Sequence, residues 1–258
     1  MDMQLKGTTF AVGGATSGLG RAIAVRLVEE GATVIGLARS RDKLTALAEE
    51  LGENFVPRAT DLADASAVDA LATYLNEREI DGCVLNAGGP PPGRVEDLSM
   101  EEWDEAYRTT LRWKIQLTRA LLPGLKARPH GRLLYVESVS IKQPIDNLVL
   151  SNALRAAVAG FVKTLTREIG GGHLTANILA PGYHATPRIT TVLRTSAERL
   201  NTNLEEVEKQ FTAETALNRL GEPDDFAALA VLLLSPLGGY LTGQVVTVDG
   251  GLVRHLTG

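Results

Sequence analysis

The sequence predicts an α/β fold, a doubly wound parallel sheet made by one domain over residues 1–258. Three observations support this prediction. Short apolar segments alternate with longer amphipathic ones along the whole chain. The early apolar segments show little apolar–polar alternation, which is typical of parallel strands buried on both faces. A glycine-rich turn follows the first of them, and no internal repeat or low-complexity linker divides the chain.

Six segments are predicted to be strands, because each is a short apolar run of suitable length. In chain order they are residues 8–12, 33–38, 82–86, 132–138, 175–179 and 244–249. The lone cysteine, Cys83, has apolar neighbours in the third of these runs and is expected to be a buried strand residue.

Helices are predicted between the strands from the signals at their ends. The segment 21–30 stops before Gly31, a natural residue to follow a helix. The segment 99–125 opens with a capping-box pair of serine and glutamate, and the segment 203–216 opens with a similar asparagine–glutamate pair. Pro223 suits the first turn of another helix.

Two stretches are expected to be irregular, residues 88–93 and 189–203. Each follows the end of a predicted strand. Ligands bind at the carboxyl ends of strands in folds of this class, so both stretches are candidates to border a substrate. Ordinary surface loops would have the same composition.

Composition limits the classes of function that need consideration. The net charge of −5 and the pI near 5.5 offer no electrostatic case for a nucleic-acid or acidic-membrane partner. A single cysteine excludes an intrachain disulfide and fits a reducing compartment. No signal-peptide pattern or membrane-spanning run occurs, and no spacing suggests a metal site, so a soluble cytoplasmic protein is expected.

The glycine-rich turn is the strongest local signal in the chain. Gly14, Gly18 and Gly20 lie between the first predicted strand and the first predicted helix. Glycines let the backbone approach a pyrophosphate closely, and the free N–H groups of the helix start favour an anion. The turn therefore predicts a dinucleotide site.

The G-x3-G-x-G spacing resembles the short-chain dehydrogenase/reductase family, and four more motifs in the same order extend the resemblance over the chain. They are "ATDLAD", "LNAGG", "NILAPGYHATP" and "TGQVVTVDGGLV". The resemblance implies a Rossmann-type fold and is closest to 3-oxoacyl-acyl-carrier-protein reductases. It places the cofactor against Gly14, Thr16, Ser17, Gly18, Leu19, Gly20, Asp61, Leu62, Asn86, Ala87, Gly88, Pro181, Gly182, His184 and Thr186.

The end of the second predicted strand indicates which dinucleotide binds. Members that are specific for NAD carry an acid here to hold the ribose hydroxyls. This chain has Ala38 followed by Arg39, which can bond a 2′-phosphate. NADP is therefore predicted over NAD, although a solvated cluster at the helix start would look the same.

The catalytic positions depart from the family pattern. The strand serine is kept as Ser138, but the tyrosine and lysine positions hold Ser151 and Arg155, and the asparagine position holds Thr110. An alkyl hydroxyl is a much weaker acid than a phenol of pKa ~10, and arginine with a pKa above roughly 12 does not shuttle protons. We expect Ser151 and Arg155 to bind carbonyl and cofactor without the family's proton transfer.

Two other residues are candidate acids. Lys142 follows Ser138 by four residues, and a desolvated lysine there would have a lowered pKa. His184 can titrate near pH 7, unless it only shapes the cofactor site through its main chain. A solvent-facing loop position is the alternative for Lys142.

Two classes of function follow. The first is an oxidoreductase that moves hydride between NADPH and a small carbonyl or alcohol substrate with a non-standard proton donor. The second is a non-catalytic NADP-binding sensor or partner subunit; a lyase or epimerase is a remoter alternative. Because typical members assemble, a homo-oligomer, either dimer or tetramer, is expected.

Overall fold

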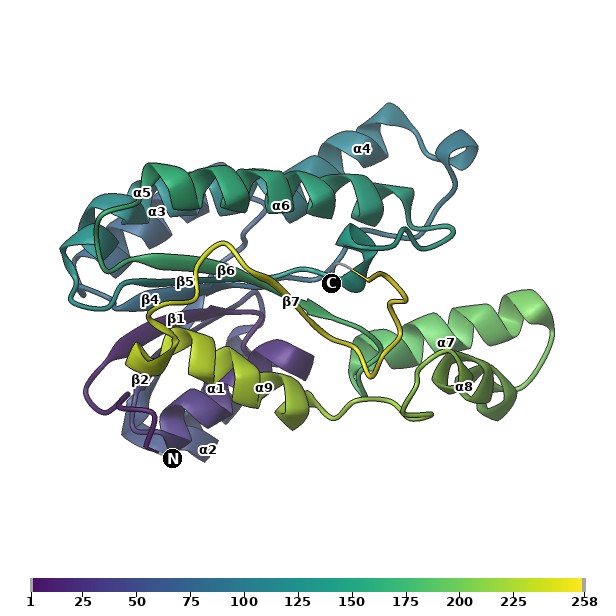
Figure 1. Ribbon diagram of the computed structural model, residues 1–258, viewed down its shortest axis with the longest axis horizontal. Helices are drawn as coiled ribbons and strands as arrows, with labels where there is room; N and C mark the ends of the chain where they lie inside the picture. Colours follow the sequence, from purple (N-terminus) through teal and green to yellow (C-terminus); the bar gives the residue numbers. More distant parts are fainter. Residues whose placement is uncertain (1, 257–258) are drawn as a thin grey trace.

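The computed structural model describes residues 2–256 and shows one seven-stranded parallel sheet covered by helices on both faces (Figure 1). The strand order is β3-β2-β1-β4-β5-β6-β7. The strands are β1 (Thr9–Gly13), β2 (Thr33–Ala38), β3 (Phe55–Ala59), β4 (Gly82–Leu85), β5 (Arg132–Val136), β6 (Thr175–Pro181) and β7 (Val245–Val248). The predicted doubly wound parallel sheet is confirmed.

Nine α-helices lie in the described residues. They are α1 (Gly18–Glu29), α2 (Arg41–Leu51), α3 (Ala65–Asn76), α4 (Met100–Tyr107), α5 (Trp113–Ala127), α6 (Val149–Glu168), α7 (Pro187–Leu200), α8 (Leu204–Ala213) and α9 (Pro223–Leu234). Helices α1, α2 and α9 bury their apolar residues in one core on one face of the sheet, and α3, α5 and α6 in a second core on the other (Figure 1). Among residues 2–256, no helix has the length and apolar character needed to cross a lipid bilayer.

All six predicted strands are present, but β3 was missed. Its residues alternate between buried and more exposed, and Pro57 interrupts the run. β3 lies at the edge of the sheet with β2 as its neighbour. Proline is tolerated at an edge because one side of the strand makes no ladder hydrogen bonds.

The predicted helix over 99–125 is divided by a π-helical turn at Arg108–Arg112. Its capping box is confirmed, because Ser99 Oγ accepts from Glu102 N and the glutamate side chain accepts from Ser99 N. π-turns of this kind are frequent at functional sites. This turn carries Thr110, whose buried hydroxyl oxygen has no hydrogen-bond partner among the described residues.

The prediction that residues 189–203 are irregular was wrong, because most of them form α7. Thr186 caps this helix by accepting from Ile189 N, and Pro187 occupies its first turn. The buried residues of α7 are Ile189, Leu193 and Ala197, which are four positions apart and therefore form a narrow stripe along one side of the helix. The many polar residues around that stripe concealed the helix in the sequence.

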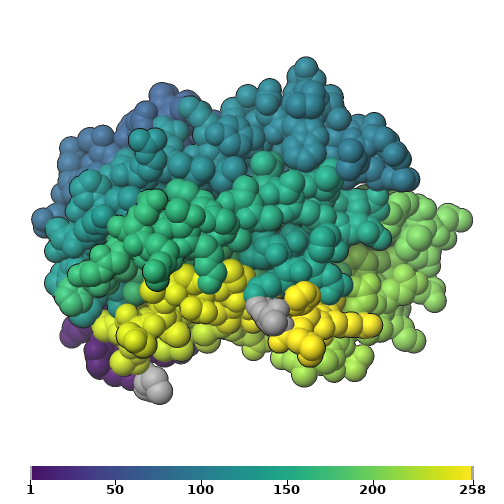
Figure 2. Space-filling view, turned by 45° about the horizontal axis from the view of Figure 1, so that its top comes forward, coloured from purple at the N-terminus to yellow at the C-terminus, as the bar shows by residue number. Residues whose placement is uncertain are grey.

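Helices α7 and α8 lie beyond one end of the sheet (Figure 1), and their light green residues form one end of the molecule in the space-filling view (Figure 2). The strand order reverses between β1 and β4, which lie side by side in the centre of the sheet. Their carboxyl ends point toward α7 (Figure 1). A crevice at this reversal is where α/β folds bind their ligands.

Candidate active site

A cleft of about 930 Å³ lies at the carboxyl ends of the central strands. Its wall combines the glycine-rich turn, the loops after β4 and β5, the start of α6, and α7. Of the stretches expected to border a substrate, the 88–93 segment contributes Gly88, Gly89, Pro92 and Gly93. The cleft is large enough for a nicotinamide and a small substrate.

Two glycines of the glycine-rich turn have a backbone conformation that other residues rarely adopt. Gly14 and Gly18 adopt φ values of 61° and 52°, in the left-handed region that favours glycine. Ser17 begins α1 without a side-chain capping bond. The first N–H groups of α1 are therefore free to bind an anion at the positive end of the helix dipole.

Asn86 joins this turn to the central strand. Its amide nitrogen donates to Gly13 O at 2.9 Å, across β1 and β4. A side-chain carbon on Gly20 would stand 2.3 Å from Gly14 O and 2.7 Å from that amide nitrogen. The helix, the turn and Asn86 thus pack at a spacing that only glycine at position 20 permits.

The remaining predicted cofactor residues fall into two groups. The cleft wall includes Gly14, Ser17, Gly18, Leu19, Asn86, Ala87, Gly88, Pro181, Gly182, His184 and Thr186. Outside that wall are Thr16, Gly20, Arg39, Asp61 and Leu62. Arg39 and Asp61 are exposed, and each lies just beyond the end of a strand, β2 and β3 respectively. Their roles toward a cofactor stay predictions.

Ser138 and Ser151 both line the cleft, and both hydroxyl oxygens already accept a hydrogen bond from the protein. Ser138 Oγ accepts from Ser140 N at 3.1 Å, and Ser151 Oγ accepts from Arg155 Nε at 3.0 Å. Neither hydroxyl donates to a protein group among the described residues. Each hydrogen is therefore available to a ligand in the cleft.

Arg155 is held rigidly on α6, where it is 7% exposed. Its Nη1 donates to the carboxylate of Glu137 at 3.0 Å and to the Glu137 and Val136 carbonyls at 3.1 and 3.4 Å. With Nε engaged by Ser151, only Nη2 has no hydrogen bond to the described residues. Arg155 also lines the cleft, so this nitrogen can serve a ligand.

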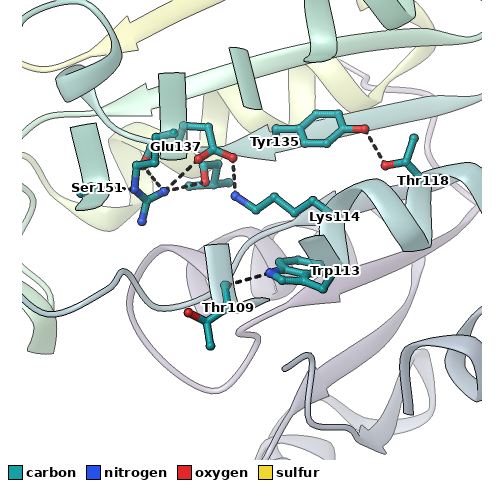
Figure 3. Close-up of polar contacts among 9 residues, drawn as sticks. Thr109, Trp113, Lys114, Thr118, Tyr135, Glu137 and Ser151 are labelled. Atoms are coloured by element: carbon teal, nitrogen blue, oxygen red, sulfur yellow. Dashed lines mark hydrogen bonds and ion pairs between the residues drawn. The ribbon is translucent and has the colours of Figure 1, made fainter. Parts of the chain in front are cut away.

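Behind Arg155 lies a buried cluster of charges that Figure 3 shows around Glu137, with Lys114 on one side and Ser151 on the other. Glu137 forms ion pairs with both Lys114 and Arg155, and its own side chain is fully buried. Burial, together with the positive charge of Arg155 and against the opposing effect of Glu137, lowers the pKa of Lys114 to about 8. Two cations thus share one carboxylate.

Sequence reasoning missed Lys114 and Glu137, although a signal for each was present. Glu137 ends an apolar run predicted to be a buried strand, and a carboxylate there needs a counter-ion. Lys114 comes four residues after Thr110 in the predicted helix 99–125, so both side chains are expected on the same side of that helix. The sequence shows no pairing between them, because they belong to different elements.

The two candidate acids differ in their surroundings, and their roles stay predictions: His184 belongs to the cleft wall, whereas Lys142 does not. Lys142 is half-buried after a short 3₁₀ turn and is absent from the cleft wall. His184 is buried with its ring edge-on to Phe226, and burial lowers its pKa. A side-chain carbon on Gly221 would stand 3.0 Å from His184 Nε2, so this nitrogen faces Gly221. The other ring nitrogen lies 3.4 Å from Gly182 O.

Comparison with known proteins identifies the family. The family described as enoyl-(acyl carrier protein) reductase matches residues 14–253. The 3-oxoacyl-[acyl-carrier-protein] reductase FabG of Vibrio harveyi is 32% identical over 252 residues, covering 97% of this chain and 99% of its own length. The chain belongs to the short-chain dehydrogenase/reductase family. Relatives within it are named as oxidoreductases.

Solved structures of this short-chain dehydrogenase/reductase (SDR) family show the same fold. The L-sorbose reductase of Gluconobacter frateurii, complexed with NADPH and L-sorbose, has a TM-score of 0.93 at 27% identity, covering 99% of this chain and all of its own. An actinorhodin polyketide ketoreductase with NADPH has a TM-score of 0.90 at 29% identity, covering 96% and 98%. The Rossmann-type SDR fold expected from the motifs is confirmed.

Proposed function

We propose that this protein is an NADPH-dependent reductase of a small carbonyl compound, working without the family's tyrosine acid. One observation carries the proposal: the hydroxyls of Ser138 and Ser151 both line the cleft with their hydrogens free. Two donors placed on one oxygen stabilise the negative charge that develops there as a carbonyl is reduced.

The glycine-rich turn supports the choice of cofactor. Free N–H groups at the start of α1 suit the pyrophosphate, and exposed Arg39 beyond β2 suits a 2′-phosphate. The L-sorbose reductase and the actinorhodin ketoreductase are both complexes with NADPH. We therefore assign NADPH as the cofactor, which when bound supplies the hydride.

In the proposed reaction the substrate carbon gains the hydride and its oxygen gains a proton, leaving an alcohol and NADP⁺. Ser138 and Ser151 hold the oxygen while its charge develops, and the nearby guanidinium of Arg155 stabilises that charge. Ser151 relays a proton from cleft water to the oxygen, accepting one as it donates its own, so that no free serine alkoxide forms. No proton passes through Arg155, because arginine stays charged.

The test is transfer of deuteride from labelled NADPH to a broad carbonyl panel at high enzyme concentration. We expect transfer to at least one carbonyl, and loss of that transfer in Ser151→Ala with NADPH binding retained. Lys142→Ala and His184→Ala should keep the acid limb of the pH–rate profile. A shift of the acid limb in either variant would identify that residue as the proton donor and contradict proton transfer through Ser151.

A second candidate function is NADP binding without turnover, as a sensor or partner subunit. The replacement of the family's tyrosine and lysine by Ser151 and Arg155 favours it. Tight NADPH binding, followed by nicotinamide fluorescence, with no transfer to any carbonyl would support this function over the reductase. Failure to bind either dinucleotide would overturn both.

We also propose that the protein acts as a homo-oligomer, a dimer or tetramer, in the cytoplasm. The exposed small residues of α6, including Ala153, Ala156 and Gly160, would let two such helices approach closely. Sedimentation velocity tests the assembly: a monomer at micromolar concentration would contradict it.

A further inference from the structure

A second arginine reaches the same place in the cleft as Arg155. Arg188, in the first turn of α7, crosses to the 88–93 loop, where its Nη2 donates to Pro90 O at 3.3 Å. A side-chain carbon on Gly89 would stand 3.0 Å from Arg155 Nη2 and 4.0 Å from Arg188 Nη2. Both guanidinium groups therefore border Gly89, and both arginines line the cleft.

The charge at this place is unbalanced. The carboxylate that Arg155 contacts is Glu137, which also serves Lys114. Arg188 forms no ion pair with a carboxylate of residues 2–256. Burial lowers the pKa of Arg188, and the charge of Arg155 lowers it further, with no opposing carboxylate. Two like charges that repel each other in one cleft are stabilised by an anion that both can bind.

The cleft also contains acidic residues, but they do not neutralise this pair. Asp97 and Asp146 line it from the loops before α4 and α6, and both are exposed. Within residues 2–256, neither aspartate forms a hydrogen bond or an ion pair with Arg155 or Arg188. A mobile anion from solution or substrate is then the natural partner of the two guanidinium groups.

We propose that Arg155 and Arg188 form a carboxylate site, so that the substrate is an oxo acid. The geometry relates this site to the reacting carbonyl. Nε of Arg155 bonds Ser151, the donor to the carbonyl oxygen, and Nη2 lies on the same planar group. A carboxylate on Nη2 would therefore lie beside a carbonyl bound at Ser151. This inference rests on the proposed reductase function and names its substrate class.

Binding to the protein saturated with NADP⁺ tests the site without turnover. The probes are benzoylformate, a 2-oxo acid, and its methyl ester, which keeps the carbonyl and removes the charge. We expect calorimetry to show about 10- to 100-fold tighter binding of the acid, the range of one or two charge-assisted hydrogen bonds. The preference should weaken as salt is raised.

Two substitutions on the same helix complete the experiment. Arg188→Gln should abolish the preference for the acid, whereas Arg194→Gln should keep it, because exposed Arg194 is outside the cleft wall. Equal affinity for acid and ester in the unmodified protein would overturn the proposal. So would an Arg188→Gln variant that binds NADP⁺ more weakly while its acid preference is unchanged, since the arginine would then serve the cofactor.

The outcomes also separate this inference from the proposed function. Deuteride transfer to ester and acid with equal efficiency would retain the reductase and overturn the carboxylate site. Selective binding of the acid with no transfer to any carbonyl would retain the site and count against the reductase.

Discussion

The two halves of the cleft differ in how their residues pack. On the side of the glycine-rich turn, the proposed dinucleotide side, Gly14, Gly20 and Asn86 pack around one another so closely that a side-chain carbon on either glycine would stand less than 3 Å from the Asn86 amide nitrogen. On the candidate catalytic side, Ser151 and Arg155 lie in front of a buried ion cluster formed by Glu137 and Lys114. One side is fixed by close backbone packing and the other by buried charges, so we expect substitutions to affect cofactor binding and proton transfer separately.

On the candidate catalytic side, Glu137 is the carboxylate that pairs with both Lys114 and Arg155. Glu137→Gln leaves Lys114 and Arg155 buried without a carboxylate, which should cost about 3–5 kcal/mol of unfolding free energy. Denaturation in urea measures this loss. The double variant Glu137→Gln/Lys114→Met should recover part of it, because one unpaired cation is removed. A single variant within about 1 kcal/mol of the parent would show that the cluster is not a stability determinant.

The two serines should affect turnover and leave the dinucleotide side intact. Ser138→Ala or Ser151→Ala should lower kcat by about 10²- to 10³-fold, the usual loss for one oxyanion donor. NADPH affinity, measured by fluorescence, should be unchanged. Equal losses in NADPH affinity and kcat would mean that the two halves are not separable in the way we describe.

Gly20→Ala tests the dinucleotide side. The new carbon would lie 2.3 Å from Gly14 O, so the turn has to open, at a cost of about 1–3 kcal/mol. NADPH affinity should fall at least several-fold, as seen by fluorescence titration. Gly172→Ala is the matched control, because a side-chain carbon there has no neighbour within 4 Å. Similar behaviour of both variants would contradict the close packing.

The smallest expected effect is a pH dependence of stability from Lys114. Its pKa is about 8 in the folded protein and 10.5 without the fold. Between these values the unfolded chain holds the proton and the folded protein does not, so stability rises with pH. The slope is at most about 1.4 kcal/mol per pH unit.

Urea denaturation of the parent protein and of Lys114→Met, from pH 7.5 to 9.5, isolates this contribution. The difference between them should grow over that window. Tyrosine ionisation does not interfere in this pH window. Burial raises the pKa of Tyr183 and of Tyr135, so these groups lower the free energy of unfolding only above about pH 10, where tyrosines of the unfolded chain lose their protons. Parallel pH profiles for the two proteins would show that Lys114 keeps its proton through the pairing with Glu137.

Local patterns determined much of this protein in advance. The glycine spacing, the apolar runs and the capping signals at Ser99, Asn203 and Pro223 each depend on neighbours within a few residues, so they are legible in the sequence. Edge strand β3 and helix α7 were missed where a polar or proline-containing pattern concealed a half-buried element. Ser138, Ser151 and Arg155 were found through the resemblance to the family.

Only the tertiary structure decided what surrounds those residues. Lys114 pairs with Glu137 because the start of α5 lies beside the end of β5, and Arg188 comes to the same loop as Arg155 because it reaches from α7 to Pro90. Such contacts depend on sheet order, register and helix packing, which bring together residues far apart in the chain. The sequence determined which residues occupy the catalytic positions, whereas the fold decided which charges they share, because electrostatic coupling depends on distance in space.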